Sequence, residues 1–378
     1  MANSKENNVN LVLYRKYRPQ KFSEIIGQEH IVKTLTNSIG MESISHAYLF
    51  SGPRGSGKTT IARIFAKAIN CQNIALASGS FEPCNKCPSC AEIMQGKSID
   101  LVEIDAASHT GVDDIRELIE GIRFAPVNSK YKIFIIDECH QLSKSAANAL
   151  LKTLEEPPSH AIFLLATTEA HKMLSTITSR CQRFDFKKLQ ILEIVKKMEF
   201  ILKKESIKFE DSALSLIALN SRGSLRDAES LLDKCISFSS GDSALTVRGI
   251  KELLGIVEVG QIAGFVDSLI SKDPKTAIFS LNSMIDNGID LQEFSKTLIF
   301  YLRQGLLLKI HPEFLNIYNS GFSVPELEKL KIQMSAVNQK DIYGMLEFFI
   351  EAENKMKYSS LAQLPLELAI INIARQES

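Results

Sequence analysis

The sequence predicts an α/β domain built on a parallel sheet, followed by two all-helical domains. Up to about Lys187, short apolar runs alternate with amphipathic helical patterns, and from Gln190 onward the strand signals nearly vanish. Strands that alternate with helices form parallel sheets, because each parallel neighbour needs a long crossover connection. A chain of 378 residues also exceeds the size of one ordinary core. We therefore expect three domains, over residues 1–187, 188–248 and 249–378.

Four apolar runs are the expected strands of the first domain, and a helix follows the first of them. The runs cover residues 47–51, 101–104, 132–136 and 162–166. Residues 59–70 carry apolar side chains at helical spacing, directly after a glycine-rich loop. The second domain is expected to contain helices over 192–205, 211–221 and 225–238, with breaks at 241–243 and Thr246. The third is expected to be helical over 250–374, with loops near 273–274, 287–288 and 311–312.

Composition and charge narrow the function. Lys and Arg total 44, and Asp and Glu also total 44, so the net charge is zero. The overall charge therefore does not indicate a nucleic-acid partner, although a local basic surface remains possible. Residues 1–10 are polar and lack the apolar centre of a secretion signal. Residues 297–308, an apolar stretch that contains Arg303, are too few to cross a bilayer. We expect a soluble cytoplasmic protein without membrane contact.

The eight residues that directly follow the first expected strand match the phosphate-loop pattern G-x-x-x-x-G-K-[ST] in full. They are Gly52, Pro53, Arg54, Gly55, Ser56, Gly57, Lys58 and Thr59. The glycines let backbone N–H groups surround phosphates, and the helix that follows points its positive end at them. Lys58 is expected to reach the β- and γ-phosphates of ATP, and the Thr59 hydroxyl to ligate Mg²⁺. The alternative, a chance match in a glycine turn, does not explain the flanking strand and helix.

The expected strand at 132–136 continues into two adjacent carboxylates, Asp137 and Glu138. Asp137 is expected to hold the magnesium ion through water, as the second metal partner of such sites. Glu138 is placed to act as a base for the attacking water. An acidic strand end before an exposed loop is the alternative, and the phosphate loop upstream disfavours it. The pair also argues against a small-molecule kinase, whose reaction needs no glutamate to activate water.

Two further polar positions fit the recognition of a γ-phosphate. Thr168 follows the expected strand at 162–166, where its hydroxyl could contact the phosphate or its water, and a plain strand terminus explains it nearly as well. Arg226 opens a helix in the second domain that Ser224 is expected to cap. From the residue pattern alone, a solvated arginine is the better explanation of Arg226.

Seven cysteines, an odd number, fit a reducing compartment better than a disulfide framework. Cys84, Cys87 and Cys90 form C-x-x-C-x-x-C, and Cys71 follows the phosphate-loop helix. Four thiolates suffice for a closed tetrahedral site, so we expect a module at about 71–90 that binds one structural Zn²⁺. Free thiols and an iron–sulfur cluster are the alternatives, and the long gap before Cys84 leaves Cys71 the least defined ligand. The cysteines expected to be packed are Cys139, Cys181 and Cys235.

Several segments together resemble the clamp-loader family of AAA+ ATPases. They are YRKYRP at 14–19 with Phe22, GQEH at 27–30, HAYLFSG at 46–52, EIDAAS at 103–108, ALLKTLEEPP at 149–158 and SRC at 179–181. A four-cysteine module after the phosphate-loop helix is typical of the bacterial gamma/tau subunits of DNA polymerase III and of their delta prime relatives. Because delta prime proteins have usually lost the phosphate loop, the intact loop favours the gamma/tau group. The matches run from about Tyr14 to Asp227, and beyond them only the helical layout is similar.

The resemblance implies an AAA+ nucleotide-binding domain, a helical lid and an all-α collar domain that oligomerises. It implies that Arg180 is an arginine finger that completes the ATP site of a neighbouring subunit. Thr168 matches the sensor-1 position and Arg226 the sensor-2 position. The resemblance therefore favours a role in nucleotide sensing for both residues over a plain strand terminus and a solvated side chain. The residues implied to lie near the adenine are Tyr14, Arg15 and Arg18.

The resemblance further implies a motor that uses ATP to load the sliding clamp onto primer–template DNA. Its implied partners are the delta and delta prime subunits, further copies of itself, the clamp and, only in a longer tau form, the polymerase core. Such a subunit is catalogued with DNA-directed DNA polymerase, although nothing here resembles a polymerase site. Residues 109–111 stand where relatives often carry basic residues, so we expect weak or no DNA contact from this loop. The sequence ends at Ser378 without the basic or proline-rich extension of a tau form.

Two other functions fit parts of the sequence. A branch-migration helicase would share the AAA+ core, but the cysteine module and the segment Ser179-Arg180-Cys181 argue against it. A non-catalytic scaffold would bind nucleotide and act only by assembly through its last domain. Stimulation of ATP hydrolysis by primed DNA with the clamp, rather than by junction DNA, would separate the motor from the helicase.

Overall fold

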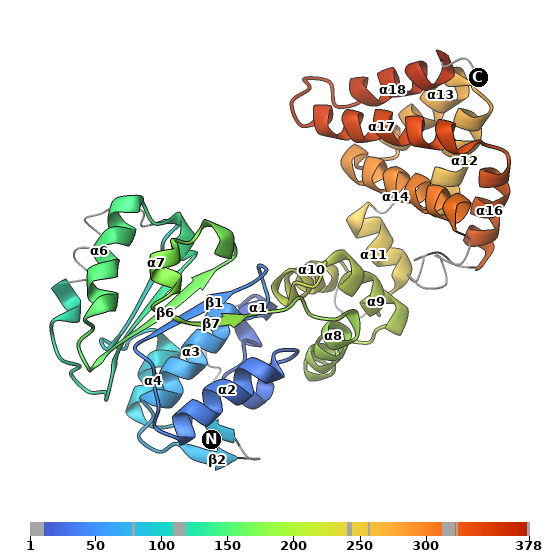
Figure 1. Cartoon of the computed structure of the whole chain (residues 1–378). Coiled ribbons are helices and arrows are strands. Elements are labelled where there is room, and N and C mark those ends of the chain that lie inside the picture. Colours follow the sequence, from blue (N-terminus) through green and yellow to red (C-terminus); the bar gives the residue numbers. More distant parts are fainter. Residues whose placement is uncertain are drawn as a thin grey trace. The chain divides into compact units, whose positions relative to one another are not determined.

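The computed structural model describes residues 11–77, 80–108, 118, 120–239, 244–255, 258–311, 322 and 324–375 (Figure 1). The chain divides into two compact units, Met1–Val247 and Arg248–Ser378. The predicted boundary between residues 248 and 249 lies one residue from this division. Both domain boundaries, this one and that between residues 187 and 188, stay predictions. The loop at 109–111, the break at 241–243 and Pro312 lie outside the described residues.

The first unit is built on a five-stranded sheet in which all neighbouring strands are parallel. In spatial order its strands are β4 (Leu101–Asp105), β5 (Lys132–Asp137), β6 (Ala161–Thr167), β1 (Ala47–Ser51) and β7 (Gln182–Asp185). The four apolar runs of the sequence are confirmed as β1, β4, β5 and β6. The sequence pattern does not reveal β7, because this edge strand buries only Phe184 and so contains no apolar run.

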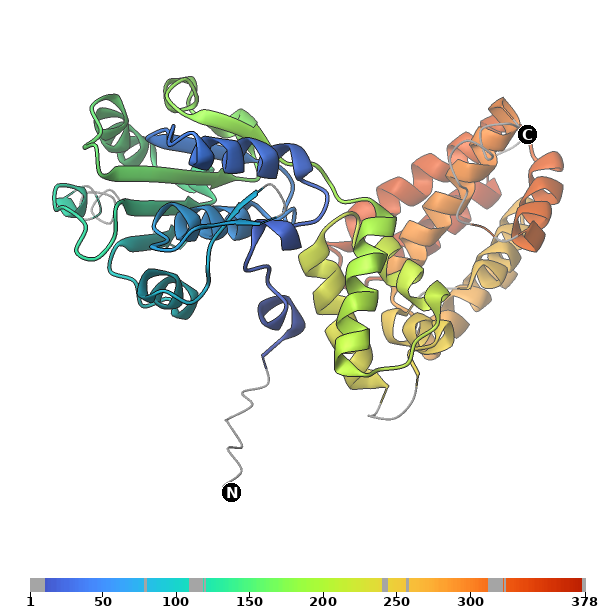
Figure 2. The same ribbon diagram turned by 90° about the horizontal axis from the view of Figure 1, so that it is seen from below.

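Helices cover both faces of the sheet (Figure 2). α2 (Glu29–Gly40) and α3 (Lys58–Ile69) pack on one face. α6 (Lys144–Glu155) and α7 (Ser175–Thr178) pack on the other. Because successive side chains of a strand point to opposite faces, each buried strand contributes to both cores: Tyr48 of β1 belongs to the first core, and the next residue belongs to the second.

The parallel register brings the carboxyl ends of the strands to one edge of the sheet. Ile136 pairs with Leu165 and Ser51 pairs with Thr167, so β1, β5 and β6 end side by side. The phosphate loop and the paired carboxylates leave the sheet at this edge. Open parallel sheets bind their ligands beyond the carboxyl ends of the strands, and the predicted phosphate loop, Asp137, Glu138 and Thr168 lie there.

Short elements surround the sheet. The chain enters through α1 (Leu13–Lys16) and the 3₁₀ turn η1 (Phe22–Glu24). A separate antiparallel pair, β2 (Ala75–Ala77) and β3 (Ser80–Glu82), precedes α4 (Pro88–Gln95), and together they form the cysteine module. Two further 3₁₀ turns follow β5 and β6, namely η2 (Cys139–Gln141) and η3 (Ala170–Lys172).

Three helices complete the first unit. They are α8 (Ile191–Glu205), α9 (Asp211–Asn220) and α10 (Leu225–Phe238), and they match the predicted helices to within one residue at each end. The predicted cap of α10 is confirmed, because the Ser224 hydroxyl accepts a hydrogen bond from the Asp227 N–H. We refer to these three helices as the lid.

The second unit is helical in its described residues. Its helices are α11 (Val247–Leu254), α12 (Val259–Ile270), α13 (Pro274–Asp286), α14 (Leu291–Ile310), α16 (Val324–Ser335), α17 (Gln339–Met356) and α18 (Leu364–Arg375). The ring of Phe265 packs edge-on against Phe294 and Phe349 in the core, with centroids 5.1 and 6.2 Å away. The predicted loops around residues 273 and 287 are confirmed: the Asp273 carboxylate caps α13, and Gly288 follows it with φ of +79°.

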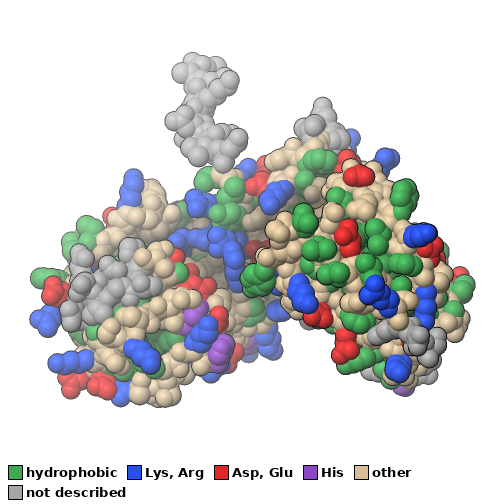
Figure 3. Space-filling model, turned by 90° about the horizontal axis from the view of Figure 1, so that it is seen from above, with side chains coloured by type: hydrophobic (Ala, Val, Ile, Leu, Met, Phe, Trp, Pro, Cys, Tyr) green, Lys and Arg blue, Asp and Glu red, His purple; other side chains and the backbone are tan. Residues whose placement is uncertain are grey.

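Within the described residues, no single helix has the length and apolar composition to cross a bilayer. Among these residues, only the pair of α11 and α12 is long and apolar enough when the two helices are taken together, and the pair is bent by 53°. Basic and acidic side chains are interspersed over the face seen in Figure 3, in line with the net charge of zero.

Candidate nucleotide-binding site and metal centre

Three glycines shape the loop between β1 and α3. Gly52, Gly55 and Gly57 have φ angles of +150°, +74° and +98°, a region that residues with a side chain rarely adopt. A Cβ atom at Gly52 would lie 2.6 Å from the backbone oxygen of Phe186, and one at Gly55 would collide with Ser224. Gly57 is the N-cap of α3, so the first N–H groups of the helix open towards the loop. The loop is thus a preformed cradle for a phosphate-like anion.

Lys58, the first residue of α3, lies in this cradle. Its ammonium donates hydrogen bonds to the backbone oxygens of Gly52 and Pro53, at 2.8 and 2.9 Å. Burial lowers the pKa of Lys58, and the carboxylates of Glu138 and Asp137 oppose that shift. A triphosphate would offer the ammonium charged acceptors, which bind it more strongly than the two carbonyl groups do.

The two predicted magnesium ligands meet at the end of β5. The Thr59 hydroxyl donates a hydrogen bond to Asp137 Oδ2 at 2.6 Å. A hydroxyl and a carboxylate beside a phosphate cradle are the oxygen donors that Mg²⁺ accepts together with phosphate oxygens and water. The residues present therefore fit a magnesium–nucleotide complex.

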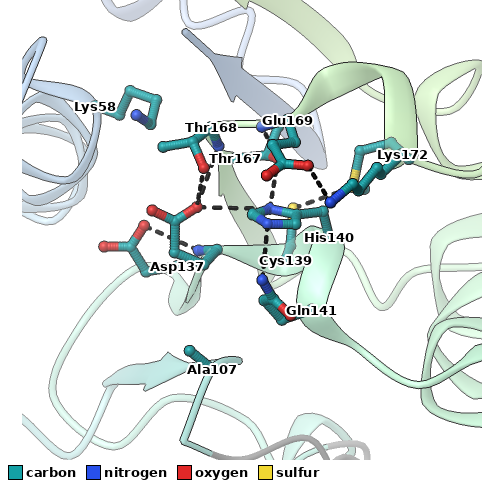
Figure 4. Close-up of polar contacts among 12 residues, drawn as sticks. Lys58, Ala107, Asp137, Cys139, His140, Gln141, Thr167, Thr168, Glu169 and Lys172 are labelled. Carbon is teal, nitrogen blue, oxygen red and sulfur yellow. Dashed lines mark hydrogen bonds and ion pairs between the residues drawn. The ribbon is translucent and has the colours of Figure 1, made fainter. Parts of the chain in front are cut away.

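Glu138 contacts Thr168, which follows β6 and is labelled in Figure 4. Its Oε2 accepts hydrogen bonds from the Thr168 backbone N–H at 3.1 Å and from the Thr168 hydroxyl at 2.8 Å. The backbone of Glu138 has φ of +46°, an uncommon conformation for a residue with a side chain. The predicted base and the predicted sensor-1 residue thus contact each other directly.

His140 belongs to the same group of side chains, although no sequence motif contains it. Its Nδ1 lies 3.0 Å from the Thr167 hydroxyl and 3.5 Å from Glu138 Oε2 (Figure 4). Its side chain is 3% exposed. The buried ring limits where the Glu138 carboxylate can move. No spacing rule points to this residue, because its hydrogen-bond partner Thr167 comes from β6, 27 residues further along the chain.

One pocket combines the phosphate loop and the paired carboxylates with the N-terminal segment and the lid. Its further lining residues are Tyr14, Arg18, Pro19, Glu24, Ile25 and Ile26 from that segment, Leu189 from the connection between β7 and α8, and Leu225, Arg226 and Glu229 from the lid. The Arg226 guanidinium lies 5.0 Å from the centroid of the Tyr14 ring. Arg15 lies 5.8 Å from the same ring but does not line the pocket. The apolar side chains, which no motif pointed to, offer walls for a flat base.

Glu229 is a buried acid in the wall of this pocket. It is 5% exposed, and its Oε1 has no hydrogen-bond partner among the described residues. Burial raises the pKa of Glu229 to about 7, and the charges of Lys197 and Arg18 oppose the shift only in part. The acid is therefore held partly protonated near neutral pH.

We expect Glu229→Gln to change the pH dependence of stability. The folded pKa of about 7 lies above the ordinary 4.5, so between these values the folded chain keeps a proton that the unfolded chain has lost. Wild-type stability must then fall as pH rises through this window, by about 2–3 kcal/mol between pH 5 and 8. Urea unfolding at both pH values should show that loss in wild type and in Glu199→Gln, a matched change on α8, but not in Glu229→Gln. Parallel profiles for all three proteins would contradict it.

Arg180 lies away from the pocket of its own chain. It is not among the lining residues, and it precedes the edge strand β7. Its guanidinium donates to Glu155 Oε1 at 2.6 Å and to the backbone oxygen of Thr176 at 2.7 Å, while its side chain stays 33% exposed. The side chain is therefore ordered and reachable from outside, as a residue that serves a neighbouring subunit must be.

The four cysteines of the module come together. The sulfur atoms of Cys71, Cys84, Cys87 and Cys90 all lie within 4.8 Å of one another. Zinc–sulfur bonds of about 2.3 Å in a tetrahedron place sulfurs somewhat under 4 Å apart, so this set fits one ion. An iron–sulfur cluster spreads its cysteines over several irons and holds them further apart. The residues present therefore fit zinc, with Cys71 as the fourth ligand.

Backbone amides support a thiolate at Cys84. Burial opposes ionisation of this thiol, but the N–H groups of Lys86 and Cys87 donate to its sulfur at 3.4 and 3.3 Å and lower its pKa to about 6. The other cysteines are packed as expected: Cys139 and Cys235 are buried and Cys181 is half-buried.

We expect metal analysis of the purified chain to find about one zinc and no iron, since four ligands close a tetrahedral site. Cys71→Ser should reduce the zinc content, whereas Cys235→Ser, a matched change at a buried cysteine outside the module, should not. Iron with visible absorbance, or full zinc retention in Cys71→Ser, would overturn the assignment.

Family models match nearly the whole chain in three consecutive parts. Residues 27–190 match the model of the DNA polymerase III delta subunit. Residues 193–241 match the ATPase lid domain of the DNA polymerase III clamp loader subunit. Residues 245–378 match domain III of the DNA polymerase III gamma and tau subunits.

Individual relatives agree with these models. The chain is 43% identical over 363 residues to the DNA polymerase III subunit tau of Bacillus subtilis, covering 96% of this chain and 63% of that protein. It is 37% identical over 362 residues to the subunit gamma of Buchnera aphidicola from Baizongia pistaciae, covering 96% of both. The solved Thermotoga maritima RuvB branch migration motor aligns with 72% of this chain and 86% of its own at 20% identity and a TM-score of 0.48, which is too distant to bear on function. By its sequence, the chain belongs to the family of DNA polymerase III gamma and tau subunits.

Proposed function

We propose that this chain is an ATP-hydrolysing motor subunit of the DNA polymerase III clamp loader, which places the sliding clamp on primed DNA. The observation that carries the proposal is the meeting of an intact phosphate loop, the pair Asp137 and Glu138, and the lid residue Arg226 in one pocket. A protein that only bound nucleotide would need the cradle but not a carboxylate placed for water activation. The family membership supplies the clamp-loader context.

The residues divide the work of hydrolysis. Lys58 and the loop N–H groups hold the phosphates, and Thr59 with Asp137 would hold Mg²⁺, which neutralises developing negative charge. Glu138 would accept the proton of the attacking water once its carboxylate turns away from Thr168. Arg226 would bring the lid onto the γ-phosphate, so the position of the lid would follow the nucleotide state.

A neighbouring subunit would supply a further positive charge at the γ-phosphate. Arg180 would enter the pocket of a neighbouring subunit and stabilise the transition state there. The proposed partners are the delta and delta prime subunits, further copies of this chain, the sliding clamp and primer–template DNA held by its phosphates. Contact with the polymerase core is proposed only for a longer tau form. Cataloguing with DNA-directed DNA polymerase, a cytoplasmic location and a structural zinc that takes no part in the chemistry belong to the same proposal.

ATP turnover of the chain assembled with delta and delta prime tests the proposal. We expect primed DNA together with the sliding clamp to raise the rate well above that of the complex alone, and a four-way junction to have little effect. Lys58→Ala provides the background, because it removes the ammonium that would hold the β- and γ-phosphates. Stimulation by the junction instead of primed DNA and clamp would favour the branch-migration alternative. No turnover in any mixture would favour the scaffold.

A further inference from the structure

The proposed hydrolysis leaves the cysteine module without a part in the reaction, yet one buried carboxylate connects this module to the nucleotide pocket. Glu82 ends β3 and is 3% exposed. Its Oε2 accepts a hydrogen bond from the Phe22 N–H, and its Oε1 accepts one from the Ser23 N–H, both at 2.8 Å. The carboxylate thus caps the first two N–H groups of η1, about 60 residues earlier in the chain.

A second contact runs beside the first. Lys67, on α3, is 2% exposed and donates a hydrogen bond to Gln20 Oε1 at 2.9 Å. Burial lowers the pKa of Lys67, and the nearby groups Cys90, Glu24, Cys71 and Glu82 oppose that shift. The ammonium therefore lies among the cysteine module, the Glu82 cap and the N-terminal segment, and attracts groups of all three.

The cysteine module also packs against α2 and is joined to Glu82 by a short, rigid connection. Phe81, the residue before Glu82, packs so closely on α2 that a Cβ atom at Gly40 would collide with its ring. Only Pro83, whose φ is fixed by its ring, separates Glu82 from the cysteine Cys84. An ion bound by the four cysteines would therefore fix the position of Glu82 relative to α3, the helix that begins at the phosphate loop.

The capped segment lines the nucleotide pocket. Arg18 and Pro19 precede η1 and Glu24, Ile25 and Ile26 end or follow it, and all five line the pocket. The phosphate loop forms a different part of the lining and does not depend on η1. The Glu82 cap thus acts on the walls offered to the base and sugar, whereas the phosphate cradle keeps its own glycine geometry.

We propose that the four-cysteine module positions the N-terminal wall of the nucleotide pocket through Glu82, so that metal occupancy and nucleotide affinity are coupled. Glu82 is then a positioning residue: it touches no nucleotide and acts through η1. Coupling of this kind is reciprocal, and typical values correspond to roughly 5- to 150-fold in affinity. The inference rests on the proposed function only in taking a nucleoside triphosphate as the ligand of the pocket.

Binding of two probes tests the position of the effect. The probes are ATPγS, which fills the whole pocket, and inorganic tripolyphosphate, which needs only the cradle. Glu82→Gln keeps one acceptor but turns an amide NH₂ towards a backbone N–H, so we expect ATPγS affinity to fall about tenfold and tripolyphosphate affinity to stay within about twofold. Glu92→Gln, a matched change on α4 of the same module, should alter neither. Circular dichroism and zinc content establish that each variant is folded and loaded.

Zinc release tests the reciprocal effect. Transfer of zinc from the intact chain to a chromogenic chelator should be slower with saturating ATPγS than without it, and this protection should be lost in Glu82→Gln but kept in Glu92→Gln. An equal release rate with and without ATPγS in wild type would refute the coupling, as would an equal loss of affinity for both probes in Glu82→Gln. If wild type binds no ATPγS, the proposed function itself fails. If it binds ATPγS and Glu82→Gln binds it equally well, only the present inference fails.

Discussion

Replacing Arg180 with alanine is expected to slow ATP hydrolysis in the assembled complex by about 10³-fold or more, the usual range for an arginine finger. The reason lies in its place on the surface. Its guanidinium is held by Glu155 Oε1 at 2.6 Å, and it is not among the residues that line the pocket of its own chain. A side chain in that position can stabilise the γ-phosphate transition state only in another subunit.

The measurement compares single-turnover hydrolysis in the complex with nucleotide affinity of the isolated chain. Arg180→Ala should leave that affinity within about twofold, since the residue makes no contact with its own pocket. Arg183→Ala is the matched control, because Arg183, on β7, is also a partly exposed arginine that pairs with a carboxylate, Asp185, at 2.9 Å. A loss of hydrolysis that is equal in the isolated chain and in the complex would exclude a role between subunits.

The parts of the site that the sequence predicts are those built from neighbouring residues. The phosphate loop is eight consecutive residues, and the positive φ angles of its three glycines are a local requirement that the sequence pattern reflects. The close approach of Phe186 to Gly52 and of Ser224 to Gly55 adds a second requirement that only the fold reveals. The strands β1, β5 and β6 are equally predictable, because burial on both faces demands unbroken apolar runs. Asp137 and Glu138 follow such a run directly, so their place at the edge of the sheet is already implied by the pattern.

The parts that the sequence does not predict depend on residues that meet only in the folded chain. Glu82 caps η1 across about 60 positions, and a single glutamate before a cysteine motif carries no signal of that partnership. Glu229 resembles any acid on a helix until burial shows otherwise. Arg226 is the intermediate case: its pattern allowed a solvated side chain, and the fold places it over the Tyr14 ring in the pocket.

The three helices of the lid follow from caps and apolar spacing, and the structure confirms them.

Other predictions concern roles in catalysis, which the fold alone does not decide. The roles of Thr168 as a sensor and of Arg180 as an arginine finger rest on the family resemblance, because neither residue has a local pattern that requires a phosphate. The structure adds a hydrogen bond from the Thr168 hydroxyl to Glu138, through which Thr168 can hold the predicted base in place.

Replacing Glu138 with glutamine is expected to lower the rate of hydrolysis in the complex by about 10²- to 10⁴-fold, the usual contribution of a general base. ATP affinity should change little, because Lys58 and the loop still hold the phosphates. Clamp loading on primed DNA then separates two functions: a motor should bind ATP and clamp but fail to turn over, whereas a scaffold should load at the full rate. Glu169→Gln is the matched control, since Glu169 lies in the same region and pairs with Lys172 (Figure 4).

The contact between Glu138 and Thr168 makes a finer form of this experiment available. Thr168→Val removes the hydroxyl that donates to Glu138 Oε2 at 2.8 Å and keeps the backbone N–H that donates at 3.1 Å. If Thr168 acts by holding the carboxylate, its removal should matter in wild type and have almost no further effect in Glu138→Gln. Residues in contact commonly show such non-additivity, whereas independent effects multiply. Rate losses that multiply in the double variant would mean that Thr168 senses the phosphate without the help of Glu138.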